Sequence, residues 1–392
     1  MKRLATPLLV LGSLVFGLAL GELFLRLIDF SYPNFYLPDD YTGESLRPGV
    51  EGWSRSEGEA YIRINSDGLR DREHSKAKPQ DTIRIAVLGD SFAEAAQVPL
   101  EATFWAHLER ELNACHAFGQ RRVEVLNFGV SGYGTAQELL TLRHRAWDYS
   151  PDMVLLAFFP GNDVRNNSKV LEPEKLRPFF AIKDGQLVLD NSFLADPAYR
   201  RIKRLAEQRR ALMGFRIYQL LRKARASGFR LQDGTTLALA RAAPAASGMS
   251  EPGLDENAFR EPGDLAWQEA WTITERLIVA LHEETTARGA KFLTVVLANA
   301  VNVYPDESLR RRYAASLGMP DLFYPERRIR QLGEENGFEV LALAPEMQRL
   351  ADATRAYFHG FANTRLGLGH WNEAGHEVAG KLIARYLCRK PD

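Results

Sequence analysis

Five short segments of almost uninterrupted apolar residues stand out along the chain. They cover residues 83–89, 123–129, 153–159, 291–298 and 338–344. Segments of this length and character are typical of strands that are buried on both faces. Apolar residues with helical spacing occur between them, over 103–114, 136–147, 265–289 and 372–388. This alternation predicts a parallel sheet covered by helices on both faces, the three-layer α/β/α class.

Two regions depart from this pattern. Residues 31–82 are polar and rich in turn formers, with one strand-like piece at 61–65. Residues 164–265 form a mainly helical insertion between the third and fourth strands. It begins with an expected hairpin around Asp184-Gly185, continues as a basic helical stretch from Tyr199 to Arg241, and ends in a loop at 243–264. We therefore expect an N-terminal helix (1–30), an extension (31–82) and a main domain (83–388) that the insertion (164–265) interrupts.

The N-terminal segment is the most apolar part of the chain. Lys2 and Arg3 precede an uncharged stretch from Leu4 to Gly21, and Glu22 follows it. This length is at the lower edge of a membrane-spanning helix, and the preceding basic residues orient such a helix with the main domain outside the cytoplasm. Ala19-Leu20-Gly21 also fits a signal-peptide cleavage site. A membrane anchor, a cleaved signal and a buried core helix therefore remain three interpretations, and the first gives a membrane-anchored, extracytoplasmic protein.

Composition and charge narrow the class of function. Lys plus Arg and Asp plus Glu both number 50, so nothing in the net charge favours nucleic acid as a partner. The two cysteines cannot form a metal cluster alone. Ligands bind at the carboxyl ends of strands in open α/β sheets, and four polar, glycine-rich loops follow the expected strands or precede the last helix. These loops are 89–91, 127–135, 160–164 and 369–376.

The order of these loops resembles the signature blocks of the SGNH/GDSL hydrolase family, over residues 83–163 and 266–388. "GDS" contains Ser91 at the position of the family's nucleophile, and "SGYGT" contains Gly132 at the glycine of the second block. "GND" contains Asn162 at the asparagine of the third block, and "HWNEAGH" contains His370 at the catalytic histidine. The resemblance implies a five-stranded, flavodoxin-like parallel sheet and a serine esterase that needs no metal or organic cofactor.

The chemistry of these residue types agrees with the implied roles. A serine hydroxyl is a weak nucleophile until a base such as imidazole accepts its proton. The backbone N–H groups of Ser91 and Gly132 and the side-chain amide of Asn162 would form an oxyanion hole, in which each donor is worth about 3–4 kcal/mol of barrier. We expect glycine at 132 to permit a close backbone approach.

The sequence departs from the family around the histidine. The family has an aspartate two or three residues before it, and this chain has Leu368 and Gly367 there. Either a backbone carbonyl orients His370, or an acid arrives from elsewhere in the chain. Of the other candidates we expect His359 to pack among aromatic residues and His376 to be partly buried or to cap the last helix. Asp90 and Asp163 are expected to support their turns.

The expected fold also brings the two cysteines into proximity. Cys115 ends the helix after the first strand, and Cys388 ends the last helix. In a doubly wound sheet these helices lie side by side and run in the same direction, so their ends are neighbours. We therefore predict a disulfide between Cys115 and Cys388, given an oxidising compartment.

Three functions follow from the sequence. The first is a membrane-anchored serine hydrolase that cleaves acyl or acetyl esters of a small molecule, lipid or polysaccharide through an acyl-Ser91 intermediate. The second is an extracytoplasmic O-acyltransferase that passes the acyl group to a sugar hydroxyl. The third is a carbohydrate-binding protein with weak catalysis, for which the missing aspartate is the best argument. The basic insertion is either a solvated face or a surface for an anionic membrane or an acidic polysaccharide.

Overall fold

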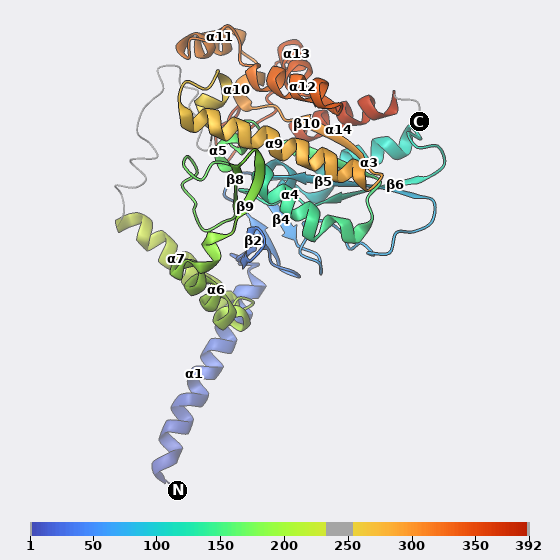
Figure 1. The fold of residues 1–392 in the computed structure, drawn as a ribbon. Coiled ribbons are helices and arrows are strands. Elements are labelled where there is room, and N and C mark those ends of the chain that lie inside the picture. The colour runs from blue at the N-terminus through green and yellow to red at the C-terminus, as the bar shows by residue number, and fades with distance from the viewer. Residues whose placement is uncertain (1, 233–253, 390–392) are drawn as a thin grey trace.

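A five-stranded, all-parallel sheet forms the centre of the molecule (Figure 1). The computed structural model describes residues 2–232 and 254–389, so part of the expected loop at 243–264 and the end of the basic stretch lie outside the described residues. The strands lie in the order β6-β5-β7-β10-β11, which is the flavodoxin-like order. This confirms the predicted fold class. Their bounds are β5 (Thr82–Gly89), β6 (Arg122–Asn127), β7 (Met153–Phe158), β10 (Lys291–Val296) and β11 (Glu339–Ala342).

Helices cover both faces of this sheet because successive residues of each strand point to opposite sides. Ile85 and Val87 of β5 lie in the core on one face, with α3 (Phe104–Ala114), α13 (Ala344–Thr354) and α14 (Glu373–Cys388). Ala86 and Leu88 lie in the core on the other face, with α4 (Thr135–His144), α9 (Leu265–Ala287) and α12 (Tyr324–Asn336). Burial on both faces explains why the strands read as continuous apolar segments.

Side-chain caps fix where three of these helices begin. The hydroxyl of Thr103 accepts a hydrogen bond from an amide of the first turn of α3, and Asp264 does the same for α9. Asn372 caps α14 by accepting from the amide of Gly375. A cap of this kind is worth about 1 kcal/mol, because it satisfies an amide that has no partner inside the helix.

The remaining helices and the hairpin of the main domain lie in the insertion and in the loops that connect the elements of the core. The expected hairpin is formed by β8 (Phe179–Lys183) and β9 (Gln186–Asp190), and Asp184 and Gly185 between them both have positive φ. The insertion contains α6 (Pro197–Arg209) and α7 (Arg216–Gln232), where a basic helical stretch was expected. The sequence analysis did not anticipate α12 and α13, nor four shorter helices: α2 (Ser91–Glu94), α5 (Asp163–Asn166), α10 (Ala300–Val303) and α11 (Glu307–Ser316). Short 3-10 turns cover Leu100–Ala102, Ala146–Tyr149, Ser192–Ala195, Arg210–Leu212 and Glu256–Phe259.

The N-terminal extension folds as two small antiparallel pairs against the core. One pair is β1 (Tyr36–Asp39) with β2 (Gly43–Leu46), and the other is β3 (Glu51–Ser54) with β4 (Ala60–Arg63). Only the last of these strands was expected from the sequence. The others are four residues long and show no clear alternation, so they carry little pattern.

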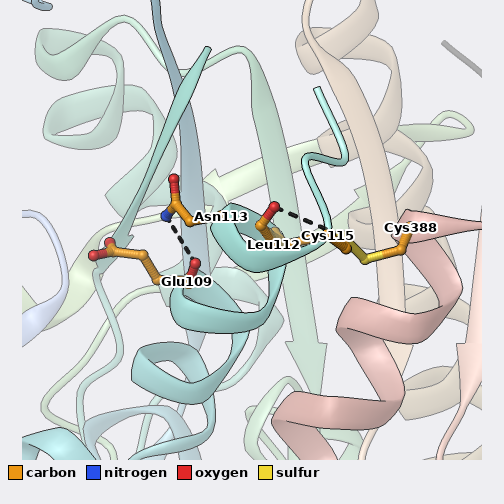
Figure 2. The surroundings of a disulfide bond; sticks show 5 residues. All are labelled: Glu109, Leu112, Asn113, Cys115 and Cys388. Carbon is orange, nitrogen blue, oxygen red and sulfur yellow. Dashed lines mark hydrogen bonds between the residues drawn. A yellow bond between two sulfur atoms is a disulfide. The ribbon is translucent and has the colours of Figure 1, made fainter. Parts of the chain in front are cut away.

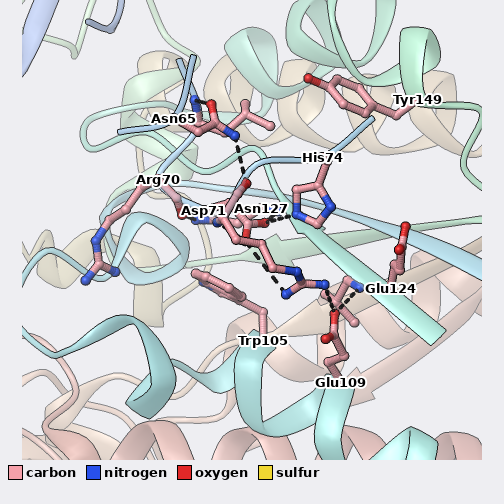
Figure 3. A network of polar contacts seen from close by, with 12 residues as sticks. Asn65, Arg70, Asp71, His74, Trp105, Glu109, Glu124, Asn127 and Tyr149 are labelled. Atoms are coloured by element: carbon pink, nitrogen blue, oxygen red, sulfur yellow. Dashed lines mark hydrogen bonds and ion pairs between the residues drawn. The ribbon is translucent and has the colours of Figure 1, made fainter. Parts of the chain in front are cut away.

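A buried polar network attaches the end of this extension to the core (Figure 3). The carboxylate of Asp71 accepts a hydrogen bond from the Asn127 amide of β6 at 2.9 Å and contacts His74 at 3.2 Å. The buried guanidinium of Arg70 donates to the carbonyls of Glu94 and Val98 at 2.6 and 2.5 Å. Because buried charges are costly unless they are paired, these contacts fix the register of the extension on the core.

The N-terminal helix α1 (Lys2–Leu27) extends away from the rest of the molecule (Figure 1). Its segment Thr6–Leu27 has the length and apolar composition needed to cross a membrane, and most of it is exposed. A soluble core helix would bury such a surface.

Cys115 and Cys388 are bonded through their sulfur atoms, with their Cα atoms 6.3 Å apart (Figure 2). The bond joins the carboxyl ends of α3 and α14, which pack side by side as expected. It closes a loop of 273 residues in the unfolded chain. In the chain-entropy account, a loop of this size gives a disulfide a large stabilising effect.

Removing this disulfide should therefore lower stability markedly. For the double variant Cys115→Ser/Cys388→Ser we expect the free energy of unfolding to fall by about 3–5 kcal/mol, as measured by chemical denaturation. The matched control is the reductant: it should shift the wild-type midpoint to that of the variant and leave the variant unchanged. An equal midpoint for the oxidised wild type and the variant would contradict the prediction.

Candidate active site

Ser91 lies at the carboxyl edge of the sheet, where β5 ends and the short helix α2 begins. Asp90 caps this turn, since its Oδ1 accepts a hydrogen bond from the Phe92 amide at 2.9 Å. Its other oxygen is 3.5 Å from Ser91 Oγ. Asp90 thus supports the turn as expected, and Ser91 is left half-exposed at its tip.

A continuous hydrogen-bonded chain connects Ser91 to a carboxylate. The Oγ of Ser91 is 2.8 Å from His370 Nε2, and His370 Nδ1 is 2.5 Å from Glu57 Oε2. The other oxygen of Glu57 accepts from the His370 backbone amide at 2.8 Å. With Nδ1–H donated to Glu57, the imidazole presents an unprotonated Nε2 to the serine hydroxyl, which is the arrangement that a general base needs.

Glu57 is the residue that the sequence reasoning missed. It is 313 positions from His370 and belongs to the loop between β3 and β4 of the N-terminal extension. Of the two alternatives for orienting His370, the structure therefore has the distant acid. The local sequence gave no signal for it, because this contact is purely tertiary.

Glycine at 369 makes this contact possible. Gly369 has φ +88°, and a Cβ at this position would come within 2.1 Å of Glu57 Oε1. The loop around Glu57 is fixed in turn by Asn363, whose side chain bonds both the amide and the carbonyl of Gly58. The glycine thus leaves room for the Glu57 carboxylate on the histidine side, and Asn363 fixes the backbone next to Glu57 on the other side.

The surroundings keep the Glu57 carboxylate charged. Burial acts to raise its pKa, but the hydrogen bonds and the charge of His370 outweigh burial, and the net pKa lies below its usual value. Glu57 is therefore an anion at neutral pH and stabilises the imidazolium that forms when His370 accepts a proton.

Two backbone amides near Ser91 are available to an incoming ligand. Within the described parts of the chain, neither the Ser91 N–H nor the Gly132 N–H donates a hydrogen bond to protein. Gly132 has φ +80°, and a Cβ there would meet no protein atom within 4 Å. Glycine is thus required here by its backbone conformation, rather than by the close contact expected from the sequence, and it leaves the space above it open.

Asn162 lies beside the same turn, with a side-chain oxygen that is buried and has no partner among the described residues. Burial raises the pKa of Asp90 to about 6, while the Phe92 amide, His370 and a side-chain hydrogen bond from Asn162 act to lower it. Asn162 and Asp90 are therefore neighbours. Asp163 supports its own turn, as expected, by accepting from the Phe159 amide at 2.7 Å.

The loop that carries Gly132 is held in place by two charged residues. Glu94 of α2 accepts hydrogen bonds from the Ser131 amide at 2.6 Å and from the Tyr36 hydroxyl at 2.8 Å. Arg177 donates to the Gly132 carbonyl at 2.7 Å. Glu94 belongs to the helix that begins at Ser91, and its contact with Ser131 connects that helix to the loop of Gly132. This connection fixes the position of the Ser91 amide relative to the Gly132 amide.

The two other histidines near the site have structural surroundings. His359 is buried among aromatic rings that include Phe92 and Trp371, and burial lowers its pKa to about 3. His376 is buried, and its Nδ1 accepts a hydrogen bond from the Phe104 amide at 3.2 Å. Burial places the pKa of His376 well below its usual value. Neither ring is set to accept a proton from Ser91.

A cavity of about 660 Å³ opens beside Gly132 and Asn162. Its walls come from three parts of the chain: the sheet-edge loops, the N-terminal extension and the insertion. The charged residues in its wall include Glu44, Arg165, Glu172, Arg177 and Arg209, and apolar ones include Leu176, Ile202, Leu205 and Met213. In the described ranges no group of three or more His, Cys, Asp or Glu residues is arranged to hold a metal ion.

The chain is similar in structure to several solved hydrolases. One is the acetyl xylan esterase AlAXEase, with 13% identity over 77% of this chain and 99% of that chain and a TM-score of 0.38. Others are the acetylxylan esterase Axe2 from Geobacillus stearothermophilus (11%, 78% and 94%, TM-score 0.38) and a putative lipolytic protein of the G-D-S-L family from Desulfitobacterium hafniense DCB-2 (11%, 77% and 98%, TM-score 0.35). No protein-family model and no curated protein sequence matches the chain.

Replacing the distant carboxylate tests its connection to His370. Glu57→Gln keeps the shape of the side chain but removes its charge and its preference for the productive imidazole tautomer. We expect kcat for ester hydrolysis to fall by about 10²–10⁴-fold with little change in KM. Glu59→Gln, two residues along on the exposed side of the same loop, is the control and should keep the wild-type rate. A Glu57→Gln rate within threefold of wild type would refute the connection.

The cavity carboxylate Glu44 should give the protein a characteristic pH dependence. Burial raises the pKa of Glu44 to about 7, with Glu94 and Glu174 adding to the effect and Arg177 opposing it. The folded protein thus holds a proton that the unfolded chain releases near pH 4.5, and stability is lost as the pH rises from about 4.5 to about 7.

Glu44→Gln removes this titration. The difference in Tm between variant and wild type should therefore be more favourable to the variant at pH 8 than at pH 5. Because the Glu44 side chain is exposed to solvent, which screens its interactions, we expect this difference to be small. Glu51→Gln, in an exposed ion pair with Arg63, should show no such change. Parallel Tm curves for the wild type and Glu44→Gln across this range would count against a titrating Glu44.

Proposed function

We propose that the protein is a serine ester hydrolase of the SGNH/GDSL type, in which Ser91 is the nucleophile, His370 the general base and Glu57 the orienting acid. The observation that carries the proposal is the hydrogen-bonded chain from Ser91 Oγ through both ring nitrogens of His370 to Glu57. A turn serine without function would have no reason to meet a histidine so oriented from 279 residues away.

The first half of the reaction acylates the serine. The ester carbonyl enters next to Ser91, and Nε2 of His370 accepts the hydroxyl proton as Oγ forms a bond to the carbonyl carbon. Negative charge moves to the carbonyl oxygen, where the amides of Ser91 and Gly132 and the Asn162 side chain donate hydrogen bonds. When the tetrahedral intermediate collapses, the imidazolium gives its proton to the leaving alcohol, and the acyl group stays on Ser91.

The second half regenerates the enzyme. Water gives a proton to Nε2 and attacks the acyl carbon, and the same donors again stabilise the oxyanion. The acid leaves as the proton returns from His370 to Ser91 Oγ. Through both halves the Glu57 carboxylate stays ionised and balances the charge of the imidazolium.

The cavity beside Gly132 and Asn162 is the site we assign to the rest of the substrate. Its wall mixes arginines, carboxylates and tyrosines with apolar side chains, which suits a polar, hydroxyl-rich group joined to an apolar one. We also propose that α1 anchors the enzyme in a membrane with the main domain on the extracytoplasmic side, because Lys2 and Arg3 precede its apolar segment.

Glu57 also weakens the case for a binding protein without catalysis. That interpretation depended on the absence of a carboxylate close to His370 in the sequence. An O-acyltransferase would use the same acyl-Ser91 intermediate and differ only in the acceptor, so the two activities are separated by what accepts the acyl group.

The experiment compares the full-length protein in detergent with its Ser91→Ala variant. We expect p-nitrophenyl acetate hydrolysis to fall by about 10⁴–10⁶-fold in Ser91→Ala. A fluorophosphonate should label the wild type and leave the variant unlabelled. Ser192→Ala, an exposed serine in the insertion, is the control and should keep full activity.

An acetylated polysaccharide with an unacetylated acceptor then separates hydrolysis from transfer. Acetate release in excess over acetylated acceptor supports the hydrolase, and the reverse supports the transferase. Equal turnover by Ser91→Ala and wild type, or no labelling of the wild type, would overturn the proposed function.

A further inference from the structure

The turn between α6 and α7 lies against the last turns of α1 (Figure 1). The carboxylate of Glu22 accepts hydrogen bonds from the backbone amides of Arg216 and Ile217, both at 3.0 Å. The side chain of Arg26 donates to the Gly214 carbonyl at 3.4 Å. Glu22 and Arg26 are part of the apolar segment Thr6–Leu27, so these contacts place the turn at the depth where that segment ends.

This turn exposes large apolar side chains next to the apolar helix. Leu212 is 48% exposed and Phe215 is 51% exposed, and Leu221 on the next turns of α7 is 63% exposed. None of them packs into the hydrophobic clusters of the described chain. Adjacent exposed apolar side chains of this size usually mark a surface that another phase or molecule covers.

The helix that leads into this turn carries a marked excess of positive charge. In α6 and the turn that follows it, the exposed basic residues outside the cavity wall are Arg200, Arg201, Arg204 and Arg210, and Glu207 is the one exposed acid in this described stretch. Exposed apolar side chains that follow a basic helix suit the interface of a bilayer that contains anionic lipids. An acidic glycan would satisfy the arginines but leave Leu212, Phe215 and Leu221 in water.

We propose that the turn formed by residues 210–216, with Leu221 beside it, is a membrane-docking surface that inserts Leu212 and Phe215 among the headgroups of an anionic bilayer. The inference rests on the proposed role of α1 as a membrane anchor. It adds that the main domain is held in a fixed orientation on the membrane and does not move freely on a tether. The opposite face of α6, with Ile202, Leu205 and Ala206, forms part of the cavity wall. The docked turn therefore holds the cavity at the membrane surface, within reach of esters carried by lipids or by glycans bound there.

The test uses the full chain in nanodiscs of phosphatidylcholine with one part in three of phosphatidylglycerol. Nitroxide labels are introduced through Phe215→Cys or, as a second site, Leu212→Cys, with the Cys115–Cys388 bond left intact. The accessibility of each label to oxygen and to a water-soluble nickel complex gives its depth. Leu14→Cys in α1 reports the anchor, and Arg311→Cys on α11, whose side chain is 77% exposed, reports the aqueous reference.

We expect the labels at 215, 212 and 14 to be more accessible to oxygen and the label at 311 to be more accessible to nickel. Lipid exposure at 14 with water exposure at both 215 and 212 would overturn the docking surface while leaving the anchor in place. Water exposure at 14 would overturn the anchor and the docking surface together. Neither of these outcomes depends on the ester hydrolysis test.

A second variant tests whether the arginines contribute to membrane docking. Arg201→Gln/Arg210→Gln should reduce the depth of the 215 label in anionic nanodiscs and leave it unchanged in pure phosphatidylcholine. If a soluble acidic polysaccharide immobilises the 215 label and anionic lipid does not change its depth, the surface is a glycan site and the proposal is wrong.

Discussion

The contact between Glu57 and His370 is the constraint on which the rest of the site depends. It joins a loop of the N-terminal extension to the last loop before α14, across 313 residues, through two hydrogen bonds. One of these fixes the imidazole ring and the other fixes the backbone of the same residue. In the proposed mechanism the extension therefore belongs to the catalytic unit, although the sheet and its helical layers are complete without it.

The need to hold Glu57 in place against His370 explains the other contacts between the extension and the core. A carboxylate that orients an imidazole is useful only if its position is accurate, since small displacements in a catalytic array cost large factors in rate. Arg70 and Asp71 bind carbonyls and an amide of the core from buried positions, and Glu94 ties Tyr36 to the loop of Gly132. Burial lowers the pKa of Arg70 to about 10, so it stays charged at neutral pH and its carbonyl contacts are charge-assisted.

Elements governed by local pattern could be predicted from the sequence. The five buried strands, the helices capped by Thr103, Asp264 and Asn372, and the loops that end those strands all carry signals within a few residues. Ser91 and His370 could be identified because each follows such a signal. Glu57 could not be, because a glutamate in a polar loop has the same local sequence whether it faces solvent or an imidazole 313 residues away. The four-residue strands β1–β3 were missed for a similar reason, since contacts with the core stabilise them more than any periodicity does.

The position of the histidine along the chain also has a consequence for biosynthesis. A nascent polypeptide that has emerged as far as β10 already contains the proposed nucleophile, amide donors and orienting acid, but it lacks His370, the proposed general base. That group arrives with the segment whose helix is clamped to α3 by the Cys115–Cys388 bond. In the proposed mechanism, reactivity would therefore begin only when α14 has docked on α3, and shorter chains would lack the general base.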